Sequence, residues 1–233
     1  PLAGIAAKVM EGETLAEQGI SDDPVPQYFA VKESVMPFDR FPGVDPVLGP
    51  EMKSTGEVMG LDSDFAMAFA KSQTAAGQPL PTEGKVFVSV RDADKEKVIP
   101  IARSFHEQGF DLLATSGTRA ALADAGVPAQ KVPKLAEGRP NIVDFIKSQD
   151  VGLIINTPSG PAPRRDEVRI RGEAIRHSVP LLTTIAAAHA SAKAVQALRE
   201  GRIQVRSLQE IHGETERLPE DISPQSLQQV TSL

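Results

Sequence analysis

The chain has 233 residues, of which 40% are apolar and 24% are charged, as in a folded protein of one or two domains. Its net charge of −6 argues against binding to nucleic acid or to acidic membranes, because both call for a basic surface. Aromatic residues make up only 4%, which excludes a surface of interleaved rings that stack on bases. The lack of Cys excludes disulfides and thiolate metal sites, and favours a cytoplasmic protein.

The sequence shows neither a membrane span nor a secretory leader. No apolar run approaches the roughly 18 residues that a membrane span requires, and no basic and apolar leader opens the chain. The chain starts at Pro1 rather than Met, in a stretch whose apolar residues already have helical spacing. We therefore expect the sequence to be a piece of a longer protein.

The first third of the chain is irregular. Residues 1–20 have the apolar spacing of a helix, whereas residues 24–60 contain six prolines, which exclude a long helix or a central strand. Such a segment usually lies over the surface of another domain. The stretch Asp62-Ser63-Asp64 offers an N-cap for a short helix over residues 65–70. Residues 72–84 are rich in Gly, Pro and small polar residues, and we interpret them as a linker.

From Lys85 onward, strand and helix patterns alternate, which predicts βαβ units and a mainly parallel sheet of about five strands with helices on both faces. Two of the helices should end at Gly109 and Gly126. Beyond His212 the chain is polar, and we expect a mobile tail. The predicted strands are 86–90, 111–114, 130–133, 151–155 and 180–183. The predicted helices are 95–108 with Pro100 inside it, 119–125, one with Pro140 at its first position, 166–177, and an alanine-rich one ending near Arg199.

Polar side chains gather where the predicted strands end. In an open α/β sheet these ends meet at one edge, beside helix N-termini that favour anions. Two lysines and several hydroxyls there suit a phosphate-sized anion, with Thr118 and Lys134 on a solvent-facing rim. The alternative is structural, because Ser and Thr at such junctions are often only helix caps. The residues are Ser89 and Lys95, the stretch Thr115-Ser116-Gly117-Thr118, Lys134, and Asn156-Thr157-Pro158-Ser159-Gly160.

The residues offer little support for catalysis. His106 and His177 fall on predicted helix exteriors, and no HExxH pattern suggests a metal. No GxGxxG or P-loop pattern occurs either. Asp166 could act as a base or simply cap the next helix. The charged residues around it form either a solvated face or a rim that steers an anion or docks a partner; they are Arg164, Arg165, Glu167, Arg169, Arg171, Glu173 and Arg176.

Several segments resemble one family. FPGVDPVLGPEMKSTGEVMG (41–60) is similar to the stretch after the second ATP-grasp unit in the large subunit of carbamoyl phosphate synthase. SVRDADK (89–95), ATSGT (114–118), KLAEGRP (134–140) and INTPSG (155–160) resemble its C-terminal allosteric domain, in the same order and spacing. The resemblance implies a three-layer, methylglyoxal-synthase-like fold over residues 85–212. It also implies a remnant of the second ATP-grasp domain at 1–71, a linker at 72–84 and a tail at 213–233.

The resemblance implies a regulatory rather than a catalytic piece. The intact enzyme is a ligase that makes carbamoyl phosphate from bicarbonate, ammonia from glutamine and two ATP, with Mg or Mn, for pyrimidine and arginine synthesis. Its partners would be the rest of the large subunit and the glutaminase subunit, with possible homo-oligomerisation. No cofactor, metal or catalytic residue is expected in this piece. The alternative on the same fold is a methylglyoxal synthase, which the lack of a His and Asp pair before Pro180 argues against.

The family's effector site, for a nucleotide monophosphate such as UMP or IMP, maps onto Ser89, Lys95, Thr115, Thr118, Lys134, Asn156 and Thr157. Some members have Thr at the position of Pro158. An ornithine-type site would involve Glu33 and Thr183, but Leu181 stands where those members have Tyr. The resemblance therefore favours a pyrimidine nucleotide over ornithine as the effector.

Overall fold

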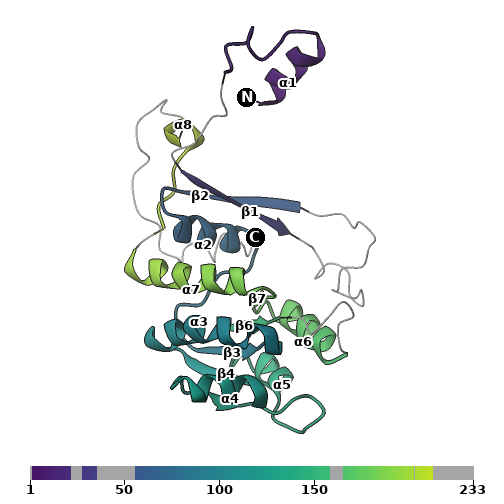
Figure 1. The fold of residues 1–233 in the computed structure, drawn as a ribbon, viewed down its shortest axis with the longest axis vertical. Coiled ribbons are helices and arrows are strands. Elements are labelled where there is room, and N and C mark those ends of the chain that lie inside the picture. The colour runs from purple at the N-terminus through teal and green to yellow at the C-terminus, as the bar shows by residue number, and fades with distance from the viewer. Residues whose placement is uncertain (1, 22–27, 36–55, 158–164, 202, 212–233) are drawn as a thin grey trace.

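The centre of the molecule is a five-stranded parallel sheet. The computed structural model describes residues 2–21, 28–35, 56–157, 165–201 and 203–211. Neighbouring strands follow the order β5-β4-β3-β6-β7, and every adjacent pair is parallel. The predicted α/β fold with a mainly parallel sheet is therefore confirmed. The strands are β3 (Lys85–Ser89), β4 (Asp111–Ala114), β5 (Gln130–Lys131), β6 (Leu153–Asn156) and β7 (Leu181–Leu182) (Figure 1).

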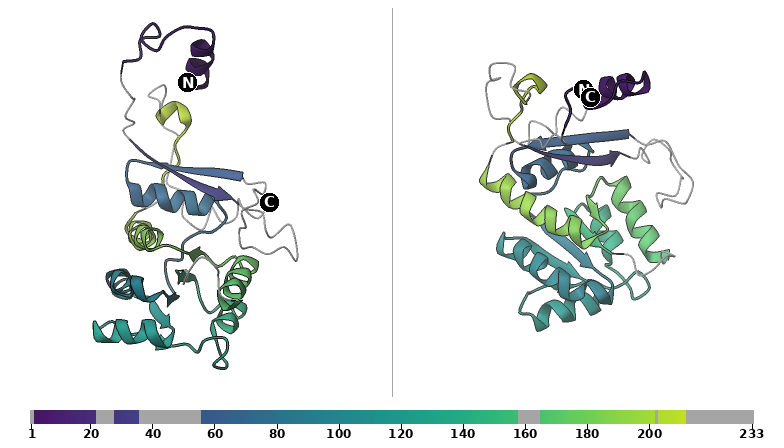
Figure 2. Two further views of the ribbon diagram at one scale, coloured as in Figure 1. Left: turned by 45° about the vertical axis from the view of Figure 1, so that its right-hand side comes forward. Right: turned by 45° about the horizontal axis from the view of Figure 1, so that its top comes forward.

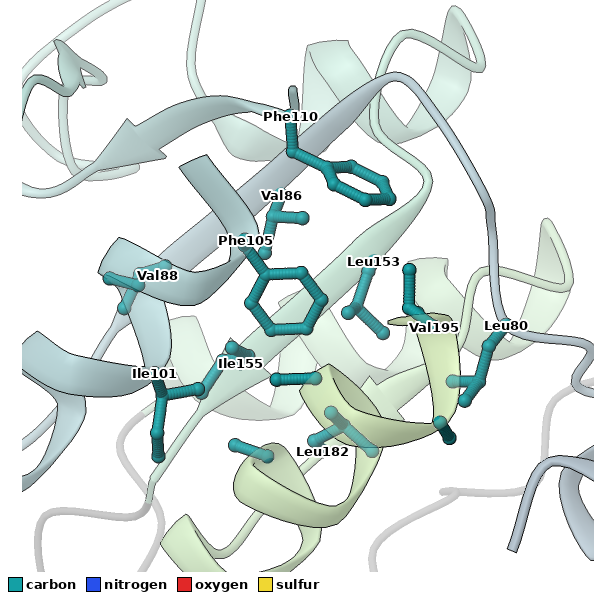
Figure 3. Packing of buried hydrophobic residues seen from close by; sticks show 14 of the residues in the cluster. Leu80, Val86, Val88, Ile101, Phe105, Phe110, Leu153, Ile155, Leu182 and Val195 are labelled. Atoms are coloured by element: carbon teal, nitrogen blue, oxygen red, sulfur yellow. The ribbon is translucent and has the colours of Figure 1, made fainter. Parts of the chain in front are cut away.

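Helices cover both faces of this sheet. Side chains alternate along a strand, so Val86 and Val88 belong to the core on one face and Phe87 to the core on the other. The first face packs against α3 (Lys95–Glu107) and α7 (Ile185–Glu200), with Phe105 and Val195 among the buried side chains (Figure 3). The second face packs against α5 (Ile142–Lys147) and α6 (Arg165–Arg176). Burial on both faces explains why the strands read as continuous apolar runs.

The helix ends agree with the sequence at some positions and not at others. Gly109 (φ 86°) and Gly126 (φ 72°) follow α3 and α4 (Ser116–Asp124) in the left-handed conformation, as predicted. However, α4 begins at Ser116 rather than residue 119, because Thr115 is the extended N-cap residue. The prediction that Pro140 is the first residue of a helix is wrong as well. Asn141 is the N-cap of α5 and accepts the Val143 N–H, so Pro140 precedes the helix.

A second, smaller unit lies against α7. Strands β1 (Phe29–Val35) and β2 (Gly56–Asp62) are antiparallel, with Val31 opposite Gly60. Helix α2 (Phe65–Ala75) lies between this pair and α7 (Figures 1 and 2). Its side chains, including Phe69, belong to the same core as the first face of the parallel sheet. The N-cap predicted within Asp62-Ser63-Asp64 is Asp64, which accepts the Met67 N–H at 2.9 Å.

The pair β1–β2 was not expected from the sequence, because the six prolines between residues 24 and 60 argued against strands there; all six lie outside the described residues. Helix α2 continues to Ala75, beyond the predicted end at residue 70, and buries Ser72 and Gln73. The first residues of the expected linker are therefore helical. Helix α1 (Leu2–Met10) forms where predicted but buries no side chain, and α8 (Leu208–Ile211) precedes the expected tail, which lies outside the described residues.

Among the described residues, no helix combines the length and apolar character needed to cross a bilayer.

Candidate functional site

A cavity of about 510 Å³ lies at the carboxyl ends of the parallel strands. It is bounded by the segments that follow β3, β4, β5 and β6 and by the first residues of α3, α4 and α6. All seven residues predicted for the effector site line this cavity: Ser89, Lys95, Thr115, Thr118, Lys134, Asn156 and Thr157. The parallel topology brings them together, because each lies at the end of a strand, in the segment after it or at the start of the next helix.

The N-terminus of α4 forms one wall of the cavity. Thr115 makes no side-chain cap to this helix; its hydroxyl instead shares a hydrogen bond of 3.2 Å with that of Ser89. The Thr118 hydroxyl accepts the Val90 N–H at 3.3 Å and keeps its own proton for a ligand. Thr118 is only 1% exposed, so its expected place on a solvent-facing rim is wrong. It ties the segment after β3 to α4.

The two lysines differ in their surroundings. The Lys95 ammonium pairs with Asp92 at 2.8 Å and lies next to Gly117, where an added Cβ would be 3.1 Å from Nζ. It thus stands at the first turn of α4, whose dipole repels a cation and attracts an anion. Lys134 is exposed, as predicted, and no ion pair involves its ammonium in the described part of the chain. Its backbone N–H is held by Glu137 at 3.1 Å.

Asn156 closes the cavity floor at the end of β6. It lies opposite Ser89 in the parallel register, and its amide donates to the Ser89 carbonyl at 3.1 Å. The side chain is 3% exposed, and its Oδ1 has no hydrogen-bond partner within the described residues. A buried acceptor without a partner is costly, so this oxygen marks a place where a ligand or water donor would be stabilised.

The segment after β3 also contains a network that the sequence analysis missed. Asp94, which is buried, accepts Arg91 Nε at 2.7 Å. Burial alone would raise the pKa of Asp94, but hydrogen bonds from Arg91 and Thr157 outweigh it and hold the pKa below its ordinary value. The Arg91 N–H donates in turn to the Thr157 hydroxyl at 3.1 Å. Arg91 and Asp92 both line the cavity, although the sequence motifs indicated no role for them.

Helix α6 contributes acidic side chains to the cavity wall. Asp166 and Glu167 both line it, and Asp166 is within the first turn of the helix rather than at its N-cap. The solvated-face interpretation is wrong for part of this helix. Glu167 and Glu173 are buried, and Arg171 lies 3.9 Å from Glu167 with a side chain only 15% exposed. Packing against α5 buries these side chains of α6. This tertiary contact could not be predicted from the local sequence.

The two residues of the ornithine-type site do not line the cavity. Glu33 on β1 is half-buried and accepts an amide hydrogen from Gln73 on α2 at 2.9 Å. Thr183 is exposed after β7, and Leu181 is half-buried on that strand. Pro158, the other departure from the family pattern, lies outside the described residues.

Comparison with known proteins agrees with the fold. Residues 97–183 match the family described as "MGS-like domain". The chain is 50% identical over 209 residues to the carbamoyl phosphate synthase large chain of Rhodopirellula baltica, covering 90% of this chain and 19% of that protein. It is 52% identical over 212 residues to that of Myxococcus xanthus, covering 91% of this chain and 20% of that protein.

The chain is thus an α/β protein that contains an MGS-like domain. The resemblance inferred from its motifs is confirmed: its sequence corresponds to the C-terminal part of the carbamoyl phosphate synthase large chain. It spans about a fifth of the length of these relatives. A solved methylglyoxal synthase from Elizabethkingia anophelis superposes with a TM-score of 0.40 at 17% identity, over 47% of this chain and 76% of that one.

Proposed function

We propose that this chain is the regulatory part of a glutamine-dependent carbamoyl phosphate synthase, and that its cavity binds a nucleotide monophosphate effector, with UMP favoured over IMP. The observation that carries the proposal is the convergence of all seven expected residues on one cavity. They come from segments as far apart in sequence as Ser89 and Thr157. Their convergence is therefore a property of the fold and not of one local motif.

The polar groups of the cavity suit a phosphate. Helices α2, α5 and α7 have side-chain caps from Asp64, Asn141 and Thr184, whereas α3 and α4, which begin at the cavity, have none. The first N–H groups of α4 are therefore available to an anion. Lys95 lies beside them, and the hydroxyl of Thr118 can donate a further hydrogen bond.

The rest of the cavity suits the remainder of a nucleotide. Its volume of about 510 Å³ is within the usual range for a small-molecule site. The carboxylates of Asp166 and Glu167 can accept hydrogen bonds from ligand O–H and N–H groups, and Ile142 and Ile170 offer apolar surface. A phosphate ion alone would leave most of this lining without contact.

The proposal for the whole enzyme follows from the relatives. The longer protein would make carbamoyl phosphate from bicarbonate, ammonia and two ATP, bind ATP with Mg or Mn in its other domains, and pair with a glutaminase subunit. Residues 1–71 would belong to its second ATP-grasp domain and 72–84 to a linker. Exposed apolar side chains in residues 1–71 support this proposal, because other parts of the longer protein would cover them. Those at least 49% exposed are Leu2, Met10, Leu15, Phe29 and Met59.

Calorimetric titration of the chain with UMP, IMP and ornithine tests the proposal. We expect saturable binding of UMP and weaker binding of IMP. Ornithine should not bind, because Leu181 lacks the phenol hydroxyl of the family's Tyr. Uridine, which lacks the phosphate, is the matched control and should bind far more weakly. Failure of both nucleotides to bind would refute the effector site.

The second candidate, a methylglyoxal synthase activity, rests on Asp166, which lines the cavity as a potential base. Incubation of the chain with dihydroxyacetone phosphate, followed by colorimetric detection of methylglyoxal, separates the two functions. We expect no product. Formation of methylglyoxal that is lost in Asp166→Asn would favour the enzyme instead.

A further inference from the structure

The expected ligand contact of Thr157 does not fit its hydrogen bonds. Its hydroxyl oxygen accepts the Arg91 N–H at 3.1 Å, and hydrogen bonding of the same hydroxyl to Asp94 lowers the pKa of that carboxyl. A hydroxyl has a single proton to donate. Thr157 is also 3% exposed. It therefore has no donor left for a bound phosphate, although it lines the cavity.

A hydrogen bond to the buried Asp94 also orients the guanidinium of Arg91. Asp94 is 4% exposed and accepts Arg91 Nε at 2.7 Å, which fixes one edge of the guanidinium. The terminal nitrogens of that group have no hydrogen-bond partner within the described residues. Arg91 lines the cavity, and its side chain is 51% exposed. A guanidinium that is held through Nε keeps its two terminal nitrogens for two oxygens of an anion such as a phosphate group.

We propose that Arg91 is a direct contact for the anionic group of the ligand, and that Asp94 and Thr157 are positioning residues that orient it. This inference rests on the proposed function, since it names a further contact of the same site. It adds a third cation to Lys95 and Lys134. It also changes the expected role of Thr157 from ligand donor to support for the arginine.

The geometry favours an arginine over a third lysine at this position. Asp94 precedes α3 directly, so the carboxylate that holds Arg91 is fixed by the same helix start that carries Lys95. Burial of Asp94 requires partners for its charge, and Arg91 and Thr157 supply them. A lysine has one nitrogen, which could bind either the carboxylate or the ligand. An arginine that binds Asp94 through Nε still has two terminal nitrogens to donate to the ligand.

Calorimetry with UMP on the full chain tests the direct contact. Arg91→Ala should weaken UMP binding about 10–100-fold, the range expected for one charge-assisted contact. Arg91→Lys should recover part of the affinity. Arg103→Ala is the matched control, because Arg103 is exposed on α3 and does not line the cavity. Unchanged affinity in Arg91→Ala, with wild-type binding intact, would overturn the contact while leaving the proposed function standing.

A double-mutant cycle tests the positioning role. Thr157→Val alone should weaken binding about tenfold, and Thr157→Ser, which keeps the hydroxyl, should stay within about twofold of wild type. In an Arg91→Ala background, Thr157→Val should cost little more, because the threonine acts only through the arginine. Additive losses would instead make Thr157 a direct ligand contact and overturn the inference. Thermal melts of each variant identify losses that come from unfolding.

Discussion

Gly60 in β2 and Ala68 in α2 meet backbone to backbone: a side-chain carbon on Gly60 would overlap the Ala68 carbonyl oxygen and lie 2.6 Å from the Ser72 nitrogen. Rigid backbone, rather than a flexible side chain, forms this contact. It lets α2 approach the two-stranded sheet while its other side packs on α7. The strand can approach so closely only with glycine at this position.

Gly60→Ala should therefore destabilise the chain by roughly 1–3 kcal/mol, the usual cost of overpacking, or by more because backbone must move. Gly56→Ala in the same strand is the control. A Cβ there would lie 3.6 Å from the Val35 Cβ, an ordinary contact, so its effect should be small. Urea unfolding measures both variants. Equal stability of the two would mean that β2 and α2 do not pack as described.

The residues around the cavity could be predicted from sequence because the parallel topology determines where they meet. Once Val86 and its neighbours are recognised as a parallel strand, the residues that follow each strand must meet at one edge. The network of Arg91 and Thr157 could not be found in this way. These residues are 66 positions apart, and which atom donates to which depends on side-chain positions that no pattern encodes.

The strands β1 and β2 were missed for a different reason. FAVKESV and GEVMGLD alternate poorly between apolar and polar residues, and the prolines around them argued against strands. The start of α4 was missed because Ser116 and Gly117 are weak helix formers. The Thr115 N-cap and the tertiary contacts of Thr118 decide where that helix begins.

Thr118 is predicted to matter for folding as well as for binding. Thr118→Val removes the acceptor of the buried Val90 N–H, and leaving such a donor without a partner costs about 1–3 kcal/mol. Thr118→Ser keeps the hydroxyl and should lose less. Thermal unfolding without ligand measures both. A melting temperature for Thr118→Val equal to that of wild type would show that the bond to Val90 contributes nothing.

Asp92 should compete with the ligand for Lys95. Its carboxylate is 95% exposed and lies 2.8 Å from the Lys95 ammonium. A bound phosphate would therefore have to replace Asp92 as the partner of Lys95. Asp92→Asn should therefore tighten UMP binding by about two- to fivefold, as suits an exposed ion pair. Asp124→Asn, an exposed change away from the cavity, controls for net charge. Calorimetry that finds equal affinities in the two variants would exclude the competition.

Acid stability should depend on Asp144. A hydrogen bond from Arg139, and one from the Asn141 N–H, lower its pKa from the ordinary 3.8 to about 2. Because the folded pKa is the lower one, this contribution to stability is present above about pH 4 and disappears as the pH falls toward 2. Arg139→Ala should raise the pKa of Asp144, which an NMR titration of its carboxyl carbon measures. No movement of that titration would exclude Arg139 as the main cause.

Lys134 offers the most direct test of the predicted site. Its side chain is exposed and has no ion pair in the described part of the chain, so its removal should leave folding unchanged. One charge-assisted contact to phosphate contributes about 1.5–3 kcal/mol, so Lys134→Ala should weaken UMP binding roughly 10–100-fold. Lys131→Ala removes the same charge from an exposed position on β5 that does not line the cavity. If calorimetry finds the two variants equally weakened, the effect is one of net charge, and the phosphate does not bind beside Lys134.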